Sequence, residues 1–105
     1  MPTLNTVIYY NMKVNNESIC SLCGRAKELT FHHFIPRKFH SNNWFTKRFS
    51  KDEMKHRGID LCSDCHSFIH RQYSNKELGR IYNTKESLLE NEKVQKFLNW
   101  VKKQR

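Results

Sequence analysis

The stretch Cys62-Ser63-Asp64-Cys65-His66-Ser67-Phe68-Ile69-His70 places two cysteines and two histidines within nine residues. In a helix, His66 and His70 are about one turn apart and share a face. Cys65 points about 100° away from His66 around the same helix. Two pairs of metal-binding side chains that face different ways predict two metal sites, each completed by residues from elsewhere in the chain.

The cysteine pair has partners in a second Cys-x-x-Cys sequence. Cys20 and Cys23 repeat the spacing of Cys62 and Cys65, and the chain has 4 cysteines in all. Two such pairs can surround one tetrahedral zinc ion, and a closed four-cysteine site is typical of structural Zn²⁺. The alternative is a set of buried thiols without metal. Because we find no signal peptide, we favour zinc over disulfides and expect a reducing, cytoplasmic setting.

The histidine pair has partners in His32-His33. One of these two residues can join His66 and His70 as a third imidazole around a separate ion that keeps open positions for water and substrate. In a strand over residues 28–35, neighbouring side chains point to opposite faces, so the two histidines can take different roles. A polar helix face, or a single mixed Cys/His finger, is the alternative interpretation.

The charge of the chain indicates a nucleic-acid partner. Its 105 residues suffice for one domain, and 19 Lys and Arg against 10 Asp and Glu give a net charge of +9. More than half of this excess lies between residues 36 and 57. We expect double-stranded DNA to contact the basic side chains there through its phosphates. These side chains are Arg37, Lys38, Lys47, Arg48, Lys51, Lys55 and Arg57. We find no apolar run long enough to cross a membrane.

Short helices and strands are predicted around these motifs. Capping-box patterns at Ser50 and Ser74 predict helices over 51–56 and 75–82. A short strand over 58–62 leads into the helix that carries the second cysteine pair. The sequence therefore predicts a small α+β protein.

Aromatic residues are assigned mainly to the core. Thr84 can cap a longer final helix, whose apolar side chains fall near helical spacing and include Trp100. We expect that helix to pack on the domain. Trp44, Phe45 and Phe49 are also expected in a small core, in preference to stacking on bases. Residues 1–18 hold a weak strand signal in an N-terminal arm.

Together these motifs resemble the HNH, or ββα-metal, nuclease family. The resemblance rests on His-His-x-x-Pro after a strand and Leu-Cys-x-x-Cys-His-x-x-x-His on a helix, and it spans residues 20–71. More narrowly, the chain is similar to small bacterial and phage members with a four-cysteine zinc. The resemblance implies a zinc-braced ββα-metal (His-Me finger) core over 19–72, followed by C-terminal helices over 73–105.

The resemblance also implies a role for each histidine. His33 matches the general base that activates water. The ligands of a catalytic divalent ion (Mg²⁺, Mn²⁺, Ni²⁺ or Zn²⁺) fall on His32, His66 and His70. The family's middle Asn is missing, and His56 is our candidate for its task of pinning the loop that carries the base. The implied reaction is hydrolysis of DNA phosphodiester bonds to 5′-phosphate and 3′-hydroxyl ends.

Two classes of function remain open. A neutral imidazole with a pKa of about 6.5 can take a proton from water near neutral pH, which suits an endonuclease. The missing Asn instead favours a non-catalytic, zinc-containing DNA-binding module. A nucleobase deaminase would need Glu two residues after its ligand histidine, where this chain has Phe34 or Ile35. A thioredoxin-like protein would not need two Cys-x-x-Cys sequences.

Overall fold

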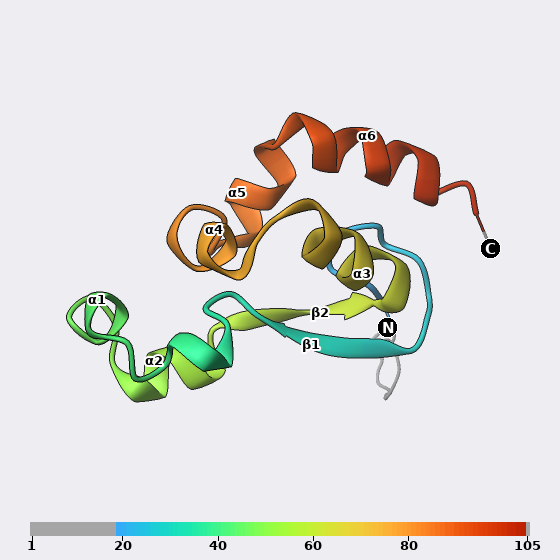
Figure 1. Ribbon diagram of the computed structural model, residues 1–105. Coiled ribbons are helices and arrows are strands. Elements are labelled where there is room, and N and C mark those ends of the chain that lie inside the picture. Colours follow the sequence, from blue (N-terminus) through green and yellow to red (C-terminus); the bar gives the residue numbers. More distant parts are fainter. Residues whose placement is uncertain (1–18, 105) are drawn as a thin grey trace.

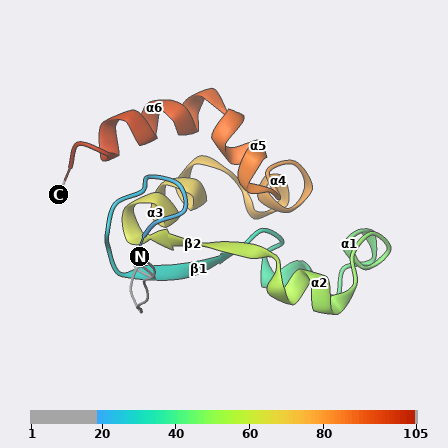
Figure 2. The same cartoon turned by 180° about the vertical axis from the view of Figure 1, so that it is seen from behind.

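Residues 19–104, which the computed structural model describes, form an α+β fold (Figure 1). Helix α3 packs on one face of a two-stranded sheet, and the last three helices pass over α3. Helices α1 and α2 form a lobe beyond one end of the sheet, as the view from behind also shows (Figure 2). The elements are β1 (Leu29–His33), the 3₁₀ helix η2 (Arg37–Phe39), α1 (Asn43–Thr46), α2 (Lys51–His56), β2 (Gly58–Cys62), α3 (Ser63–Gln72), α4 (Asn75–Arg80), α5 (Lys85–Glu90) and α6 (Glu92–Val101).

Two sequence-based expectations concern the N-terminal arm and membrane-spanning segments. The arm predicted over residues 1–18 lies outside the described residues. Among the helices of residues 19–104, none has the length and apolar character that crossing a bilayer requires.

The register of the sheet decides which way the histidines of β1 point. The strands are antiparallel, with His32 opposite Ile59 and His33 opposite Gly58. Because side chains alternate along a strand, His32 faces α3 and is fully buried, whereas His33 points to the other face. The prediction of opposite faces is confirmed. The strand ends at His33, earlier than predicted, because the chain turns there towards Pro36, which has no N–H for a ladder bond.

Two separate hydrophobic clusters stabilise the fold. The larger one fills the space between the sheet, α3 and the last three helices, and it includes all four cysteines. The smaller one holds the lobe together. It consists of buried Ile35, Phe45 and Met54, with Trp44 and Phe49 partly buried against them. The expected small aromatic core is therefore present, and it gives the lobe its own support.

Capping boxes begin α2 and α4 as predicted. The Ser50 hydroxyl accepts the Glu53 N–H at 3.0 Å, and the Glu53 carboxylate accepts the Ser50 N–H at 3.2 Å. Ser74 and Glu77 make the same pair of bonds at 3.1 and 2.9 Å. Each box satisfies two backbone donors that a helix start would otherwise leave unpaired.

The final helix predicted from Thr84 is in fact two helices. Asn91 separates α5 from α6 because its backbone is extended (ψ 129°). Its side-chain oxygen accepts the N–H groups of Lys93 and Val94, at 3.0 and 3.3 Å, and so starts a new helix.

Trp100 is 58% exposed, so its predicted place in the core is wrong. The buried residues of α6 are Val94, Leu98 and Val101, whose spacing defines one face of the helix. Trp100 falls outside that face and touches the partly buried Phe97 at a ring distance of 5.9 Å.

Candidate metal centres

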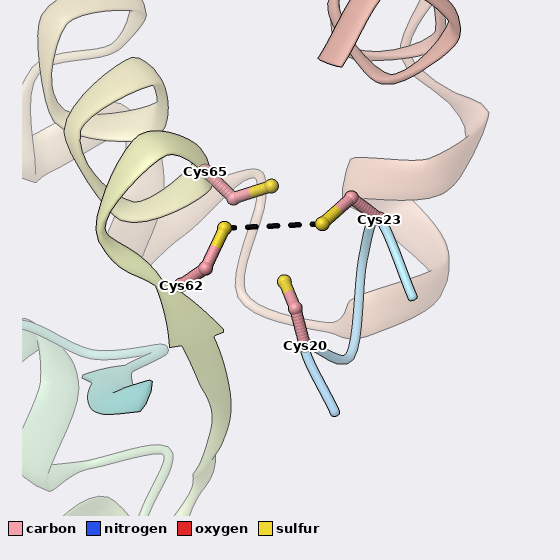
Figure 3. Close-up of side chains that lie close together, drawn as sticks. All are labelled: Cys20, Cys23, Cys62 and Cys65. Carbon is pink, nitrogen blue, oxygen red and sulfur yellow. Dashed lines mark hydrogen bonds between the residues drawn. The ribbon is translucent and has the colours of Figure 1, made fainter. Parts of the chain in front are cut away.

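Four cysteines converge from two distant parts of the chain (Figure 3). Cys20 and Cys23 precede β1, whereas Cys62 ends β2 and Cys65 lies in the first turn of α3. All four are buried, and their Sγ atoms lie within 4.8 Å of one another. The Sγ atoms of Cys23 and Cys62 are 3.8 Å apart, which matches the edge of a tetrahedron with Zn–S bonds of about 2.3 Å. The cluster is suited to one structural zinc ion.

A tight turn presents the first cysteine pair to the second. Gly24 has a φ of 78°, a left-handed conformation that costs other residues more than glycine. Its N–H donates to the Cys20 carbonyl at 3.0 Å, and the Cys20 N–H donates to the Arg25 carbonyl at 3.0 Å. The Ser21 N–H then bonds the Asp60 carbonyl of β2 at 3.0 Å, which docks the turn on the sheet.

The closeness of the sulfurs changes their acidity. A hydrogen bond from the Cys65 thiol lowers the pKa of Cys20 to about 4, and the same bond raises the pKa of Cys65. The two opposite shifts describe one proton shared by two sulfurs. The thiolate is the form of cysteine that binds zinc.

Arg25 is a further member of this site, and no sequence motif marks it. Its Nε and Nη2 atoms donate to the Sγ atoms of Cys23 and Cys62, each at 3.3 Å, and Nη2 is 2.9 Å from Oδ2 of Asp64. The bond to Asp64, followed by that to Cys23, raises the pKa of Arg25 above its ordinary value. The guanidinium places positive charge beside sulfurs that carry negative charge when they bind zinc.

Three histidines converge on the other candidate centre. His32 comes from β1, and His66 and His70 come from successive turns of α3. Their ligand nitrogens lie within 4.8 Å of one another, and the ring centroids are 5.0 to 5.3 Å apart. Neither ring nitrogen of the buried His32 has a hydrogen-bond partner among residues 19–104. Because a buried polar atom without a partner is costly, a cation bound at this nitrogen would satisfy it.

These histidines are neutral at pH 7 and keep a lone pair for a metal ion. Burial, and after it the charges of His66 and His70, lower the pKa of His32 to about 3. Burial also lowers the pKa of His66 and of His70. The Thr30 hydroxyl is 2.7 Å from Nδ1 of His66 and 3.5 Å from the Leu61 carbonyl. If it donates to that carbonyl, it accepts the Nδ1–H of His66 and leaves Nε2 as the ligand atom.

His33 opens into a hollow of about 560 Å³ on the other side of β1. The hollow is lined by three imidazoles and three cationic side chains, and by no carboxylate of the described residues. These side chains are His33, His40, His56, Arg37, Lys51 and Lys55. Burial first, then the charges of His40 and Arg37, lower the pKa of His33. At neutral pH, His33 can therefore accept a proton beside a surface suited to phosphate.

The other four predicted DNA contacts lie elsewhere in and around the lobe; they are Lys38, Lys47, Arg48 and Arg57. The Arg48 guanidinium lies 3.9 Å from the Trp44 ring centroid and donates to the Trp44 carbonyl at 2.8 Å. Arg57 donates from Nε to the Asn83 carbonyl at 3.3 Å and lies 5.2 Å from the Phe49 ring. Both arginines therefore make contacts within the protein. Arg48 contacts the lobe, and Arg57 joins the lobe to Asn83, which follows α4.

His56 does not make the loop-pinning bond that we predicted for it. Its Nδ1 atom lies 3.0 Å from the Asp52 carbonyl, one turn earlier in its own helix. An imidazole bond to the loop after His33 is present, but His40 makes it: Nε2 of His40 is 2.8 Å from the Ile35 carbonyl. The turn at η2, which spacing from the second strand does not reveal, brings His40 to this loop.

Comparison with known proteins identifies a relative. No family model matches the chain, and no solved structure does. The chain is 33% identical over 87 residues to the uncharacterized protein YisB of Bacillus subtilis (strain 168). The match covers 82% of this chain and 75% of YisB. At this identity and coverage, the chain belongs to the same family as YisB.

Proposed function

We propose that this member of the YisB family is a metal-dependent DNA endonuclease of the HNH, or ββα-metal, type. The observation that carries the proposal is the division of histidines at β1. His32 joins two histidines of α3 on one face, whereas His33 opens into a cationic hollow on the other. A general base and an ion site would therefore lie on neighbouring residues of one strand. Two antiparallel strands with α3 on one face support the same assignment.

The ion would be held by His32, His66 and His70. Neutral imidazoles suit Zn²⁺ and Ni²⁺, whereas Mg²⁺ and Mn²⁺ prefer oxygen ligands. A divalent ion supplies a positive charge that polarises a phosphate oxygen and offsets the charge on the leaving oxygen. His32 is fully buried, which keeps its imidazole neutral and shields this ligand from water.

His33 would take a proton from a water molecule whose oxygen attacks phosphorus. The bond between phosphorus and the 3′ oxygen then breaks, and that oxygen gains a proton from solvent. The products are a 5′-phosphate and a 3′-hydroxyl. Arg37, Lys51 and Lys55 line the hollow beside His33 and would hold the neighbouring phosphates of a duplex.

The four-cysteine site would act as a structural zinc site in this proposal. It joins the turn before β1 to the junction of β2 and α3, and so fixes the helix that carries His66 and His70. In a domain this small, metal binding adds directly to the free energy of folding. A reducing compartment such as the cytoplasm would keep the thiols available.

Plasmid cleavage tests the proposal. Supercoiled plasmid is incubated with the wild-type protein or with His33→Ala, in Mg²⁺, Mn²⁺, Ni²⁺ or Zn²⁺, after identical purification. We expect cleavage by the wild type and a rate lower by about 10²- to 10⁴-fold in the variant. Zinc content, circular dichroism and DNA affinity should be the same for both proteins.

Equal traces of cleavage from both proteins, with DNA binding intact, would refute the catalytic proposal. The alternative, a non-catalytic zinc-containing DNA-binding module, would then stand. The observation that favours it is that His56 bonds its own helix, so that the family's Asn has no counterpart at this position.

A further inference from the structure

The segment just after His33 is held at three points. The Phe34 N–H donates to the Arg57 carbonyl at 3.0 Å, which ties the end of β1 to the residue before β2. The Ile35 side chain is fully buried in the small cluster of the lobe. The Ile35 carbonyl, two residues after His33, is bonded by the His40 ring.

The bond to Ile35 indicates which ring nitrogen of His40 carries a hydrogen. Nε2 is 2.8 Å from the carbonyl oxygen. A carbonyl can only accept, so Nε2 carries the hydrogen, and Nδ1 of the neutral ring is left as an acceptor. The His40 backbone is also anchored, because its N–H donates to the Arg37 carbonyl at 3.1 Å where η2 ends. The ring is thus held at its tip and at its base.

Among residues 19–104, two aromatic rings lie against the His33 imidazole. The His40 ring lies 5.9 Å away between centroids, at 63°. The Phe31 ring lies 4.9 Å away at 87°, an edge-to-face contact on the open face of the sheet. Gly58, opposite His33, leaves room for this arrangement: a Cβ there would lie 2.5 Å from the Phe31 ring. These contacts restrict the orientations that the imidazole can adopt.

We propose that His40 is a positioning residue for His33. The inference rests on the proposed function, in which His33 is the general base. The Nε2–H bond of His40 holds the turn that follows the base. The His40 ring also restricts the rotation of the His33 imidazole, which lines the hollow. His40 is poorly suited to be a phosphate ligand instead, because its ring donor is already used by the Ile35 carbonyl.

Two substitutions separate the hydrogen bond from the ring. In His40→Gln, the amide nitrogen takes the place of Nε2 and can still donate to Ile35. His40→Phe keeps an aromatic ring but has no donor. We expect His40→Phe to lower kcat about 10- to 100-fold with KM within about twofold, because a base that is slightly misplaced loses rate rather than affinity. His40→Gln should recover kcat to within about threefold of the wild type.

A second readout does not depend on cleavage. The ring carbon and proton resonances of ¹³C-labelled histidine, with His33 assigned through His33→Ala, report the surroundings of the imidazole. The His33 signals should move further in His40→Phe, which loses the bond to Ile35, than in His40→Gln, which loses only the ring contact. Unmoved signals in both variants would overturn the inference, and so would an equal loss in both variants that is confined to KM. A wild type that does not cut DNA, with His33 signals that move as expected, would refute the nuclease and support the positioning role.

Discussion

Removal of Lys51 and Lys55 should change the salt dependence of DNA binding by a calculable amount. The two residues are exposed, lie one turn apart on α2 and line the hollow beside His33. Each phosphate contact on duplex DNA contributes about −0.9 to the slope of log K against log salt. Loss of two contacts should make the slope less steep by about 1.8. Between about 50 and 200 mM salt, the wild-type advantage over the double alanine variant should therefore shrink about 12-fold.

Fluorescence anisotropy of a labelled duplex measures these slopes. Both proteins carry His33→Ala, so that the DNA stays intact during the titration. The matched control, Lys96→Ala with Lys103→Ala, removes the same charge from α6 and the residues after it, on the opposite side of α3 from the sheet (Figure 2). Its slope should equal that of the parent. Equal changes in the two double variants would refute the reasoning, because total charge rather than the hollow would then govern binding. No change in the first variant would also refute it, because Lys51 and Lys55 would then make no phosphate contacts.

Three further predictions concern single residues. Arg25→Met loses both N–H···S bonds and should weaken zinc binding about tenfold in chelator competition; unchanged affinity would contradict its role. Gly58→Ala puts a Cβ 2.2 Å from the His32 carbonyl oxygen. Urea unfolding should therefore show a free energy of unfolding lower by about 1 to 3 kcal/mol. A decrease under about 0.5 kcal/mol would argue against this packing. Stability should fall as pH drops below about 6.5, because the unfolded chain then protonates His32 while the folded chain, with a pKa of about 3 there, does not. The loss due to His32 should reach about 1.4 kcal/mol by about pH 5.5. With a single equivalent of zinc, which fills the four-cysteine site, His32→Phe should remove this loss; an identical pH profile for that variant would contradict the assignment.

Features that depend on neighbouring residues could be predicted from the sequence. The capping box at Ser50 needs only Glu53, three residues later, and it begins α2 where expected. His66 and His70 share a face because helical geometry places residues four apart together. The cysteine pairs were also matched correctly, since the spacing of zinc ligands is itself a local signal.

Features that depend on tertiary contacts could not be predicted in this way. Arg25 meets Cys62 and Asp64 across 37 and 39 residues, and no local pattern marks it. Thr30 reaches His66 only because β1 pairs with β2 ahead of α3. The exposure of a tryptophan in α6 likewise follows from which face of the helix meets the core.

The position of His40 after β1 and the helix break at Asn91 also could not be predicted from local spacing. Counting back from the second strand suggested His56, whereas the turn at η2 returns His40 to the base of the strand. The break at Asn91 was missed because an Asn in an otherwise helical pattern acts as a cap only when its own backbone leaves the helical conformation. Spacing along the chain does not encode either event.

The central claim is that the segment from Cys62 to His70 serves two metal ions. Anomalous diffraction from crystals grown with zinc and soaked in Mn²⁺, with data at the absorption edge of each metal, tests it most directly. The account predicts a zinc peak between the four sulfurs and a second peak bonded to His32, His66 and His70. A single peak at the cysteines, with none at the histidines in millimolar Mn²⁺ or Zn²⁺, would contradict it.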